Sequence, residues 1–248
     1  MATGTGMCES RHSLFRIVLT LVTLAVLAGC TQASVLRNKE PDAKPSQHVR
    51  VLLMPPEIEL AELTAGGLVA PRADWTEQAT RNIIEALRAE LQAKNAELIL
   101  YEPPQDPQKR YRYDQLIKLH NAVREAIAYH RNRDNGFRLT TKDRDDLDWT
   151  LGADVRLLRE EFDADYALFL SVQDLYASGG RKALTFMLSV LYLFPVLPGA
   201  GQYGAASLVD LHDGELEWFN RFASQTGDLR SPDAVRISLE NILKDLPL

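Results

Sequence analysis

Histidine is the side chain most often used for acid–base chemistry and metal binding near neutral pH, and this chain of 248 residues has five of them. Four lie beyond residue 30: His48, His120, His130 and His212. His120 and His130 fall on one expected helix, and their ten-residue spacing points them to different sides of it. The four are therefore expected to be solvent-exposed or helix-capping residues, and no metal site is predicted.

Other candidates for catalysis are weak. No serine or threonine has an obvious base close to it in the sequence, so no nucleophile is predicted. Glu57, Glu59 and Glu62 could pair for acid–base work. They alternate with Ile58 and Leu60, however, which is typical of an edge strand with one solvated face. The chain is expected not to be an enzyme, with a hydrolase that uses these carboxylates as a remote alternative.

Residues 199–204 (GAGQYG) match the G-x-G-x-x-G pattern of dinucleotide-binding loops. In those loops the pattern follows a strand and opens a helix, so that the helix N-terminus faces the pyrophosphate. Here the pattern comes before an expected strand, which reverses the context. No cofactor is predicted.

The first 29 residues have the organisation of a secretory signal. Arg11 and Arg16 are their only basic residues, and an apolar run (IVLTLVTLAVLAG) extends from Ile17 to the residue before Cys30. As a helix this run is about 20 Å long, whereas the hydrocarbon core of a bilayer is about 30 Å thick. We therefore expect an exported chain, with residues 1–29 as a signal peptide.

The end of this run is more specific, because Leu27-Ala28-Gly29-Cys30 resembles the lipobox of bacterial lipoproteins. The resemblance implies cleavage after Gly29 and attachment of a diacylglycerol to the Cys30 thiol, with palmitate-type chains anchoring the mature N-terminus. Two or three acyl chains give a stable anchor, since each buried methylene contributes about 0.8 kcal/mol. Thr31 stands where an aspartate usually marks inner-membrane retention. The resemblance therefore implies an outer-membrane location, facing the periplasm.

The remaining chain is expected to form one domain on a tether. Residues 30–48, the lipidated cysteine and a polar segment with prolines, are typical of a flexible tether. Residues 49–248 are expected to fold as a single periplasmic domain, which is long enough to bury a substantial core. The net charge of −6 argues against a nucleic-acid partner, because such proteins need a basic surface to displace counterions.

Apolar patterns within the domain predict alternating strands and helices. Strands are expected at residues 49–54, 97–102, 166–172, 205–211 and 216–224. Helices are expected from a capping box at Asp74, at residues 111–131 and 154–162, and from Ser231-Pro232 onward. Residues 57–73, with Gly66-Gly67, are expected to hold a small hairpin.

These elements predict an α/β fold, with α+β as the alternative. The nearly continuous apolar run at 166–172 indicates a strand buried on both faces of a sheet. Asp213-Gly214 predicts a hairpin between the last two strands. The expected architecture is a mixed sheet of about five strands flanked by helices, with a C-terminal β-hairpin and helix.

Three segments resemble a group of small periplasmic α/β domains. They are residues 49–56 (VRVLLMPP), 162–174 (FDADYALFLSVQD) and 205–220 (AASLVDLHDGELEWFN). The group includes the curli secretion-channel lipoprotein, the lipoprotein activator of a penicillin-binding protein, the N-terminal domain of the Tol system's propeller protein, and proteobacterial lipoproteins of the same type. The resemblance implies an architecture over roughly residues 49–244, and a fold alone does not carry a function across.

Residues 183–209 contain no charged residue and are expected to form an insert in the domain. Their apolar half, residues 183–197, would be about 22 Å long as a helix, which is short for a membrane span. Three interpretations are open: a buried crossover element, an exposed element that contacts the membrane or a partner, and a strand pair of an oligomeric pore. Glycines on both sides slightly favour the second. Its expected contact residues are Phe186, Leu188, Leu191, Tyr192 and Phe194.

Together these features predict a lipid-anchored cell-envelope protein that acts as a non-enzymatic binding or assembly module in the periplasm. Its expected partners are the membrane, through the lipid on Cys30, and an envelope protein or a second copy of itself. The alternative is a subunit of an envelope export or pore-forming assembly that uses residues 183–209.

Overall fold

The computed structural model describes residues 31–38, 48–131, 139, 142–143, 145–193, 199–225 and 227–248. The expected signal peptide, Cys30 and Phe194 lie outside these ranges. The strands are β1 (Thr31–Arg37), β2 (Val49–Leu53), β3 (Glu57–Leu63), β4 (Val69–Pro71), β5 (Ala96–Leu100), β6 (Tyr166–Ala177), β7 (Gly201–Asp210) and β8 (Leu216–Ser224). The helices are α2 (Ala73–Ala93), α3 (Pro107–Arg131), the 3₁₀ helix η2 (Ala153–Val155), α4 (Arg156–Phe162), α5 (Gly179–Tyr192) and α6 (Pro232–Ile242).

The strands form one mixed sheet in the order β1-β8-β7-β6-β2-β5, and β3 pairs with both β6 and β4. β2 runs parallel to β5 and β6, and β3 is also parallel to β6. The pairs β6–β7, β7–β8 and β8–β1 are antiparallel. The predicted α/β class and mixed sheet are confirmed, although the sheet has eight strands rather than about five. The additional ones are β1 and the β3–β4 hairpin.

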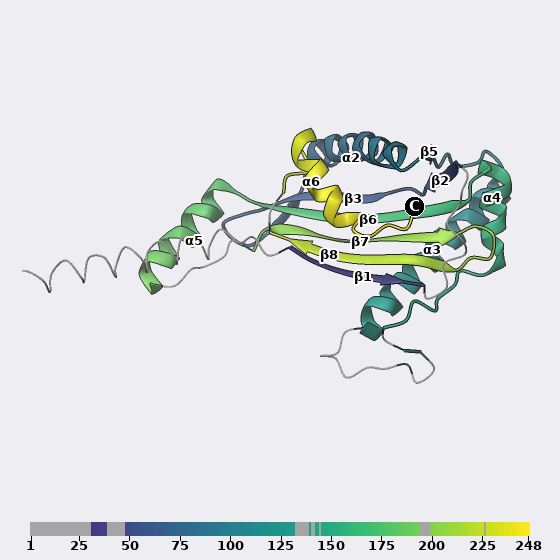
Figure 1. The fold of residues 1–248 in the computed structure, drawn as a ribbon. Helices are drawn as coiled ribbons and strands as arrows, with labels where there is room; N and C mark the ends of the chain where they lie inside the picture. Colours follow the sequence, from purple (N-terminus) through teal and green to yellow (C-terminus); the bar gives the residue numbers. More distant parts are fainter. Residues whose placement is uncertain are drawn as a thin grey trace, which may run out of the picture.

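Helices cover both faces of the sheet (Figure 1). On one face, α2 and α6 pack against the alternate β6 residues Leu168 and Leu170. On the other, α3 and α4 pack against Ala167 and Phe169. β6 is therefore buried on both faces, as the apolar run predicts. α2 buries an apolar stripe with a spacing of four residues, which is the pattern that indicates a helix with one face on a core: Ala79, Ile83, Leu87 and Leu91.

β6 is paired along both of its edges. β7 lies along one edge from Tyr166 to Leu175. The other edge is shared by β2 and then β3, which are separated by Pro55 and Pro56. Proline has no backbone N–H to donate, so it interrupts the strand there. Two short parallel strands thus align end to end against one long central strand.

The prediction of a flexible tether over residues 30–48 is wrong for its first part. Residues 31–37 form β1, which pairs with β8 from Thr31 opposite Ser224 to Arg37 opposite Trp218. Leu36 is buried, but the polar residues around it hide the alternation that usually indicates a strand. Residues 39–47 lie outside the described ranges. The folded domain therefore includes residues 31–37, which lie outside the predicted bounds of 49–248.

The predicted capping box at Asp74 is also wrong. α2 begins at Ala73, and the Asp74 carboxylate accepts hydrogen bonds from Arg72 Nε at 3.1 Å and Nη2 at 3.0 Å instead of capping the helix. The other local signals are confirmed. α6 begins at Pro232 after Ser231, and both expected hairpins, β3–β4 and β7–β8, form.

Gly204 lies in β7 where the sheet leaves no room for a Cβ. A Cβ built there would lie 2.2 Å from the Ser171 carbonyl oxygen and 2.7 Å from Cζ of Phe222. Gly204→Ala is therefore expected to lower the free energy of unfolding by about 1–3 kcal/mol, the usual cost of overpacking, in a denaturant titration. Gly66→Ala is the control, because nothing lies within 4 Å of a Cβ at that turn. Equal stability of the Gly204 variant and the parent protein would contradict this packing.

Candidate functional site

His120 and Ser207 form the described pair that most resembles a catalytic arrangement. His120 lies on α3 and Ser207 on β7, and the histidine Nε2 is 2.6 Å from the serine Oγ. The imidazole stacks on Phe169 with ring centroids 3.7 Å apart, and its Nδ1 lies 3.3 Å from Oδ1 of Asn121. A base beside a hydroxyl is the geometry that activates a serine nucleophile.

This pair is closed to substrates. His120 is 3% exposed and Ser207 is 1% exposed. The cavity beside them measures about 10 Å³, which is the space of roughly one water molecule. Burial lowers the pKa of His120 to about 4, so the ring is neutral at neutral pH. The contact between His120 and Ser207 joins α3 to the sheet. The cavity beside the two residues is too small to admit a substrate.

The prediction of exposed histidines is wrong for His120 and His130, because both are buried. Ten residues along a helix correspond to a net rotation of only about 80°, so both rings fit on the broad face of α3 that meets the sheet. His130 Nδ1 accepts a hydrogen bond from the Leu139 N–H at 3.1 Å. His48 and His212 are exposed, as predicted. Across the described ranges, no cluster of three or more His, Cys, Asp or Glu could hold a metal ion.

The three glutamates of β3 have separate partners. Glu57 forms an ion pair with Arg124 at 2.9 Å, Glu62 forms one with Arg72 at 3.5 Å, and Glu59 accepts a hydrogen bond from a glutamine of β6. Although partial burial acts to raise it, hydrogen bonds from Arg124 and Asn121 hold the pKa of Glu57 below its usual value. These carboxylates do not form an acid–base pair.

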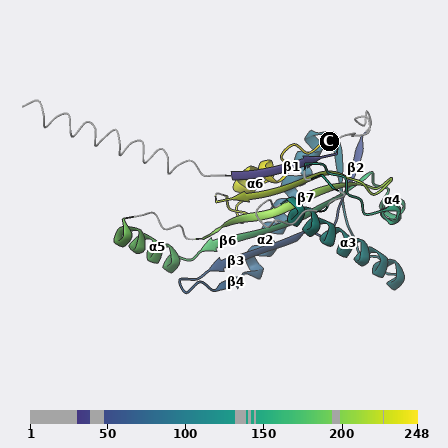
Figure 2. The same cartoon turned by 90° about the horizontal axis from the view of Figure 1, so that it is seen from below.

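A helix that leaves the body of the domain is the strongest candidate for a functional surface. α5 projects from the end of the sheet at which β6 finishes (Figures 1 and 2). Ser178 caps its start, since the serine Oγ accepts a hydrogen bond from the Arg181 N–H at 3.1 Å. Thr185 is the buried residue of the helix. We call residues 179–193 the arm.

The arm exposes large apolar side chains. Phe186 is 73% exposed and Leu191 is 71% exposed. At 100° per residue, positions 186, 187, 190 and 191 lie within an arc of about 140°, so they share one face. The exposed large hydrophobic residues of the arm are Phe186, Met187, Val190, Leu191, Tyr192 and Leu193. A contiguous apolar patch of this kind is typical of a contact surface.

The arm decides between the interpretations of residues 183–209. Phe186, Leu191 and Tyr192 are exposed and Leu188 is half-buried, so a buried crossover element is wrong for residues 183–192. The second half of the segment is not an insert, because residues 201–209 lie in β7 between β6 and β8. If residues 201–209 formed a pore strand, β7 would have to lose its pairing with β6 and β8. In the described part of the chain, no helix is long and apolar enough to cross a membrane.

The tip of the β3–β4 hairpin lies beside the first turn of the arm (Figure 2). A Cβ on Gly180 would lie 3.4 Å from the Cβ of Ala65. Leu68 at this tip is 72% exposed, and Val69 is exposed as well. The predicted contact set lacks both residues, because nothing in the sequence indicates which helix the hairpin meets. We call Leu68 and Val69 the hairpin tip.

A buried polar network holds the end of β6 from which the arm starts. The Asp174 carboxylate accepts hydrogen bonds from the Tyr176 hydroxyl and from Gln202 Nε2, the latter at 2.9 Å. The oxygen of the same Tyr176 hydroxyl lies 3.1 Å from Asp228 Oδ1, and Arg230 pairs with Asp228 at 2.7 Å. Burial raises the pKa of Asp174 above its usual value. A cleft of about 460 Å³ opens beside this network, at the base of the arm.

Similarity between this chain and known proteins is found among solved structures. No family model matches the chain, and no curated protein matches it. Among solved structures, a variant of PelC from Paraburkholderia phytofirmans, crystallised as a dodecamer, is similar over 89% of this chain and 97% of its own, with 14% identity and a TM-score of 0.36. Another PelC dodecamer from this organism is similar over 86% of this chain and 97% of its own, with 12% identity and a TM-score of 0.35.

Similarity at these TM-scores and identities does not establish a shared function. Both solved structures are PelC, and neither is a curli-channel lipoprotein or a penicillin-binding-protein activator. The resemblance to the curli-channel and penicillin-binding-protein-activator lipoproteins therefore stays a prediction.

The buried His120 makes stability depend on pH. Its pKa rises from about 4 in the folded state to the ordinary 6.5 on unfolding. Because the unfolded state binds more protons between these values, the free energy of unfolding falls as the pH drops from 6.5 to 4. His120→Gln is expected to be less stable than the parent at pH 7 and to show a flatter pH dependence in this window, as measured by urea titrations.

The control is His212→Gln, which alters an exposed ring and is expected to keep the slope of the parent. Comparison with the parent cancels the opposite contribution of Glu217, whose pKa is raised to about 7 by burial and by Asp210. A His120 variant with an unchanged slope would mean that His120 is protonated in the folded state near its ordinary pKa.

Proposed function

We propose that this chain is a lipid-anchored protein of the bacterial outer membrane whose domain faces the periplasm and acts as a non-enzymatic binding or assembly module. The observation that carries the proposal is the arm, a helix whose apolar face is held clear of the domain. The arm is the contact surface of the module. The lipobox resemblance at residues 27–30 supports the anchor.

The energetics of the arm favour contact with another surface. Full burial of one Leu or Phe side chain stabilises by about 1.5–3 kcal/mol relative to exposure in water. Phe186 and Leu191 are each more than two-thirds exposed, and they share a face with Met187 and Val190. Covering this face therefore releases a free energy comparable with the marginal stability of a small domain.

The described polar sites support contact rather than catalysis. His120 and Ser207 have the spacing of a base and a nucleophile, but they meet beside a cavity of about 10 Å³. A substrate group several atoms in size does not fit in that space. Glu57 and Glu62 are each held by an arginine.

Lipidation is tested by growing cells that express the chain with an alkyne-bearing palmitate analogue and measuring the label on the purified protein. The parent is expected to carry the label, and Cys30→Ser is expected to lose it. Cys8→Ser is the matched control, because Cys8 is the only other cysteine and lies in the segment expected to be removed. Label that survives in the Cys30 variant would contradict the anchor.

Contact through the arm is tested by photo-crosslinking in intact cells. A photoreactive amino acid at Leu191 is expected to give covalent adducts, which mass spectrometry identifies as protein or lipid. The same amino acid at Tyr111, an exposed aromatic position near the start of α3, where Lys109 pairs with Glu161 of α4, is expected to give none.

A folding control separates contact from misfolding. Phe186→Ser combined with Leu191→Ser removes exposed side chains only, so the free energy of unfolding is expected to change by less than about 1 kcal/mol. If position 191 gives no adduct in the folded protein, the arm is not the contact surface.

A further inference from the structure

The end of the sheet that carries the arm is also the end at which the chain enters β1. A single row of paired residues crosses four strands there: Thr31, Ser224, Gln202 and Asp174. Neighbouring strands are about 4.8 Å apart, so Thr31 lies about 14 Å from Asp174 across the sheet. The arm begins at Gly179, shortly after Asp174 on β6. The start of the folded domain and the base of the arm are therefore close together.

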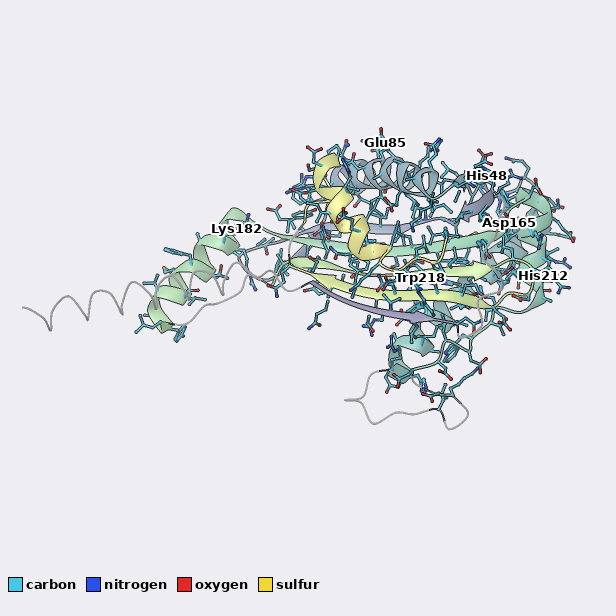
Figure 3. The ribbon with its side chains drawn as sticks, viewed as in Figure 1. His48, Glu85, Asp165, Lys182, His212 and Trp218 are labelled. Atoms are coloured by element: carbon cyan, nitrogen blue, oxygen red, sulfur yellow. The ribbon has the colours of Figure 1, made fainter. Side chains whose placement is uncertain are left out.

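This arrangement leaves no spacer between the expected lipid and the folded domain. Cys30 is bonded directly to Thr31, the first residue of β1. A lipid on Cys30 would thus hold this end of the sheet against the bilayer. The opposite end lies about 40 Å away, since β6 spans twelve residues between α4 and α5. Figure 3 shows Lys182 on the arm side of the domain and His212 at the far end.

The surface at this end has the chemistry of a membrane contact. The hairpin tip lies beside the first turn of the arm, and the apolar face of the arm begins at Phe186, about 9 Å farther along the helix. Both surfaces are exposed. Arg181 and Lys182, in the first turn of the arm, are the only charged residues between positions 179 and 193. Lys182 is exposed and lies about 40° from Phe186 around the helix. A basic residue next to an apolar helix face suits the phosphate groups of a lipid surface.

We infer that the apolar face of α5 and the hairpin tip lie in the interfacial layer of the same bilayer that holds the lipid of Cys30. The inference rests on the proposed function, because it takes the lipid on Cys30 as given. α5 has fourteen residues and is about 21 Å long, so it lies along the membrane surface instead of crossing it. Its apolar face would enter the boundary between headgroups and acyl chains to a depth of about 5–10 Å.

The bilayer is favoured over a protein as the occupant because of this covalent geometry. A lipid on Cys30 turns contact between the arm and the membrane into an intramolecular event at high effective concentration. A second chain, or another envelope protein, has no such advantage and would have to displace the arm from a surface that is always beside it. Together, these contacts determine the orientation of the domain relative to the membrane: the lipid, the arm and the hairpin tip.

The experiment uses full-length protein purified from membranes and reconstituted in vesicles of phosphatidylethanolamine and phosphatidylglycerol. Cysteines are introduced singly by Leu191→Cys, Leu68→Cys and, as the matched control at the α4 end, Tyr111→Cys, and are labelled with an environment-sensitive fluorophore. Nitroxide-bearing lipids are expected to quench the label at positions 191 and 68 by at least about two-fold and to leave position 111 unchanged, because only the first two lie at bilayer depth.

Vesicle flotation and fatty-acid labelling of the same samples distinguish loss of the membrane contact of α5 from loss of the lipid anchor. If the protein carries the acyl label and floats, but position 191 is not quenched, the membrane inference is overturned while the lipid anchor stands. A protein adduct at position 191 in cells would then identify the occupant. Quenching at position 191 without quenching at position 68 would overturn the hairpin contact. A chain that is neither labelled nor floats would overturn the proposed function itself.

Discussion

β6 has hydrogen-bonded neighbours along both edges and apolar side chains packed on both faces, and the positions of the other elements follow from it. Shifting the strand by one residue would exchange Leu168 and Phe169 between two different cores, so its register is fixed. The two ends of β6 are therefore rigid points about 40 Å apart. α4 leads into one end and α5 leaves from the other. The placement of the exposed helix is thus a property of the central strand.

The polar network at the end of β6 explains how an exposed helix keeps a defined position. A buried carboxylate is costly unless hydrogen bonds satisfy it, and the Asp174 carboxylate receives them from Tyr176 and Gln202. Tyr176 also receives the Leu229 N–H at 3.0 Å, so the network joins β6, β7 and the segment before α6. Trp75 packs against this region with the Arg230 guanidinium 4.6 Å from its ring. The arm therefore starts from a strand end that hydrogen bonds hold in place, although no residue of α5 belongs to the hydrophobic core.

Local patterns predicted the elements whose state is decided by neighbouring residues: the two-sided β6, the stripe of α2 and the β7–β8 hairpin. The sequence could not predict β1, because TQASVLR becomes a strand only through an open edge of β8 far along the chain. The burial of His120 and the pairing with Ser207 depend on which face of α3 meets the sheet. The sequence could not predict the exposure of the arm either, for a related reason. An apolar helix has the same composition whether a neighbour covers it or not, and only the tertiary arrangement decides this.

β1 also sets how the domain responds to force. A pull on the N-terminal end of β1 that is directed along the strand acts perpendicular to the hydrogen bonds that join β1 to β8. All seven residue pairs are then loaded together in shear, instead of being separated one after another as in peeling. Arg37, at the other end of β1, donates a hydrogen bond to the Asp245 carbonyl and adds a link to the C-terminal segment. An edge strand that looks expendable is thus a mechanical coupling, able to transmit tension from the N-terminus into the whole sheet.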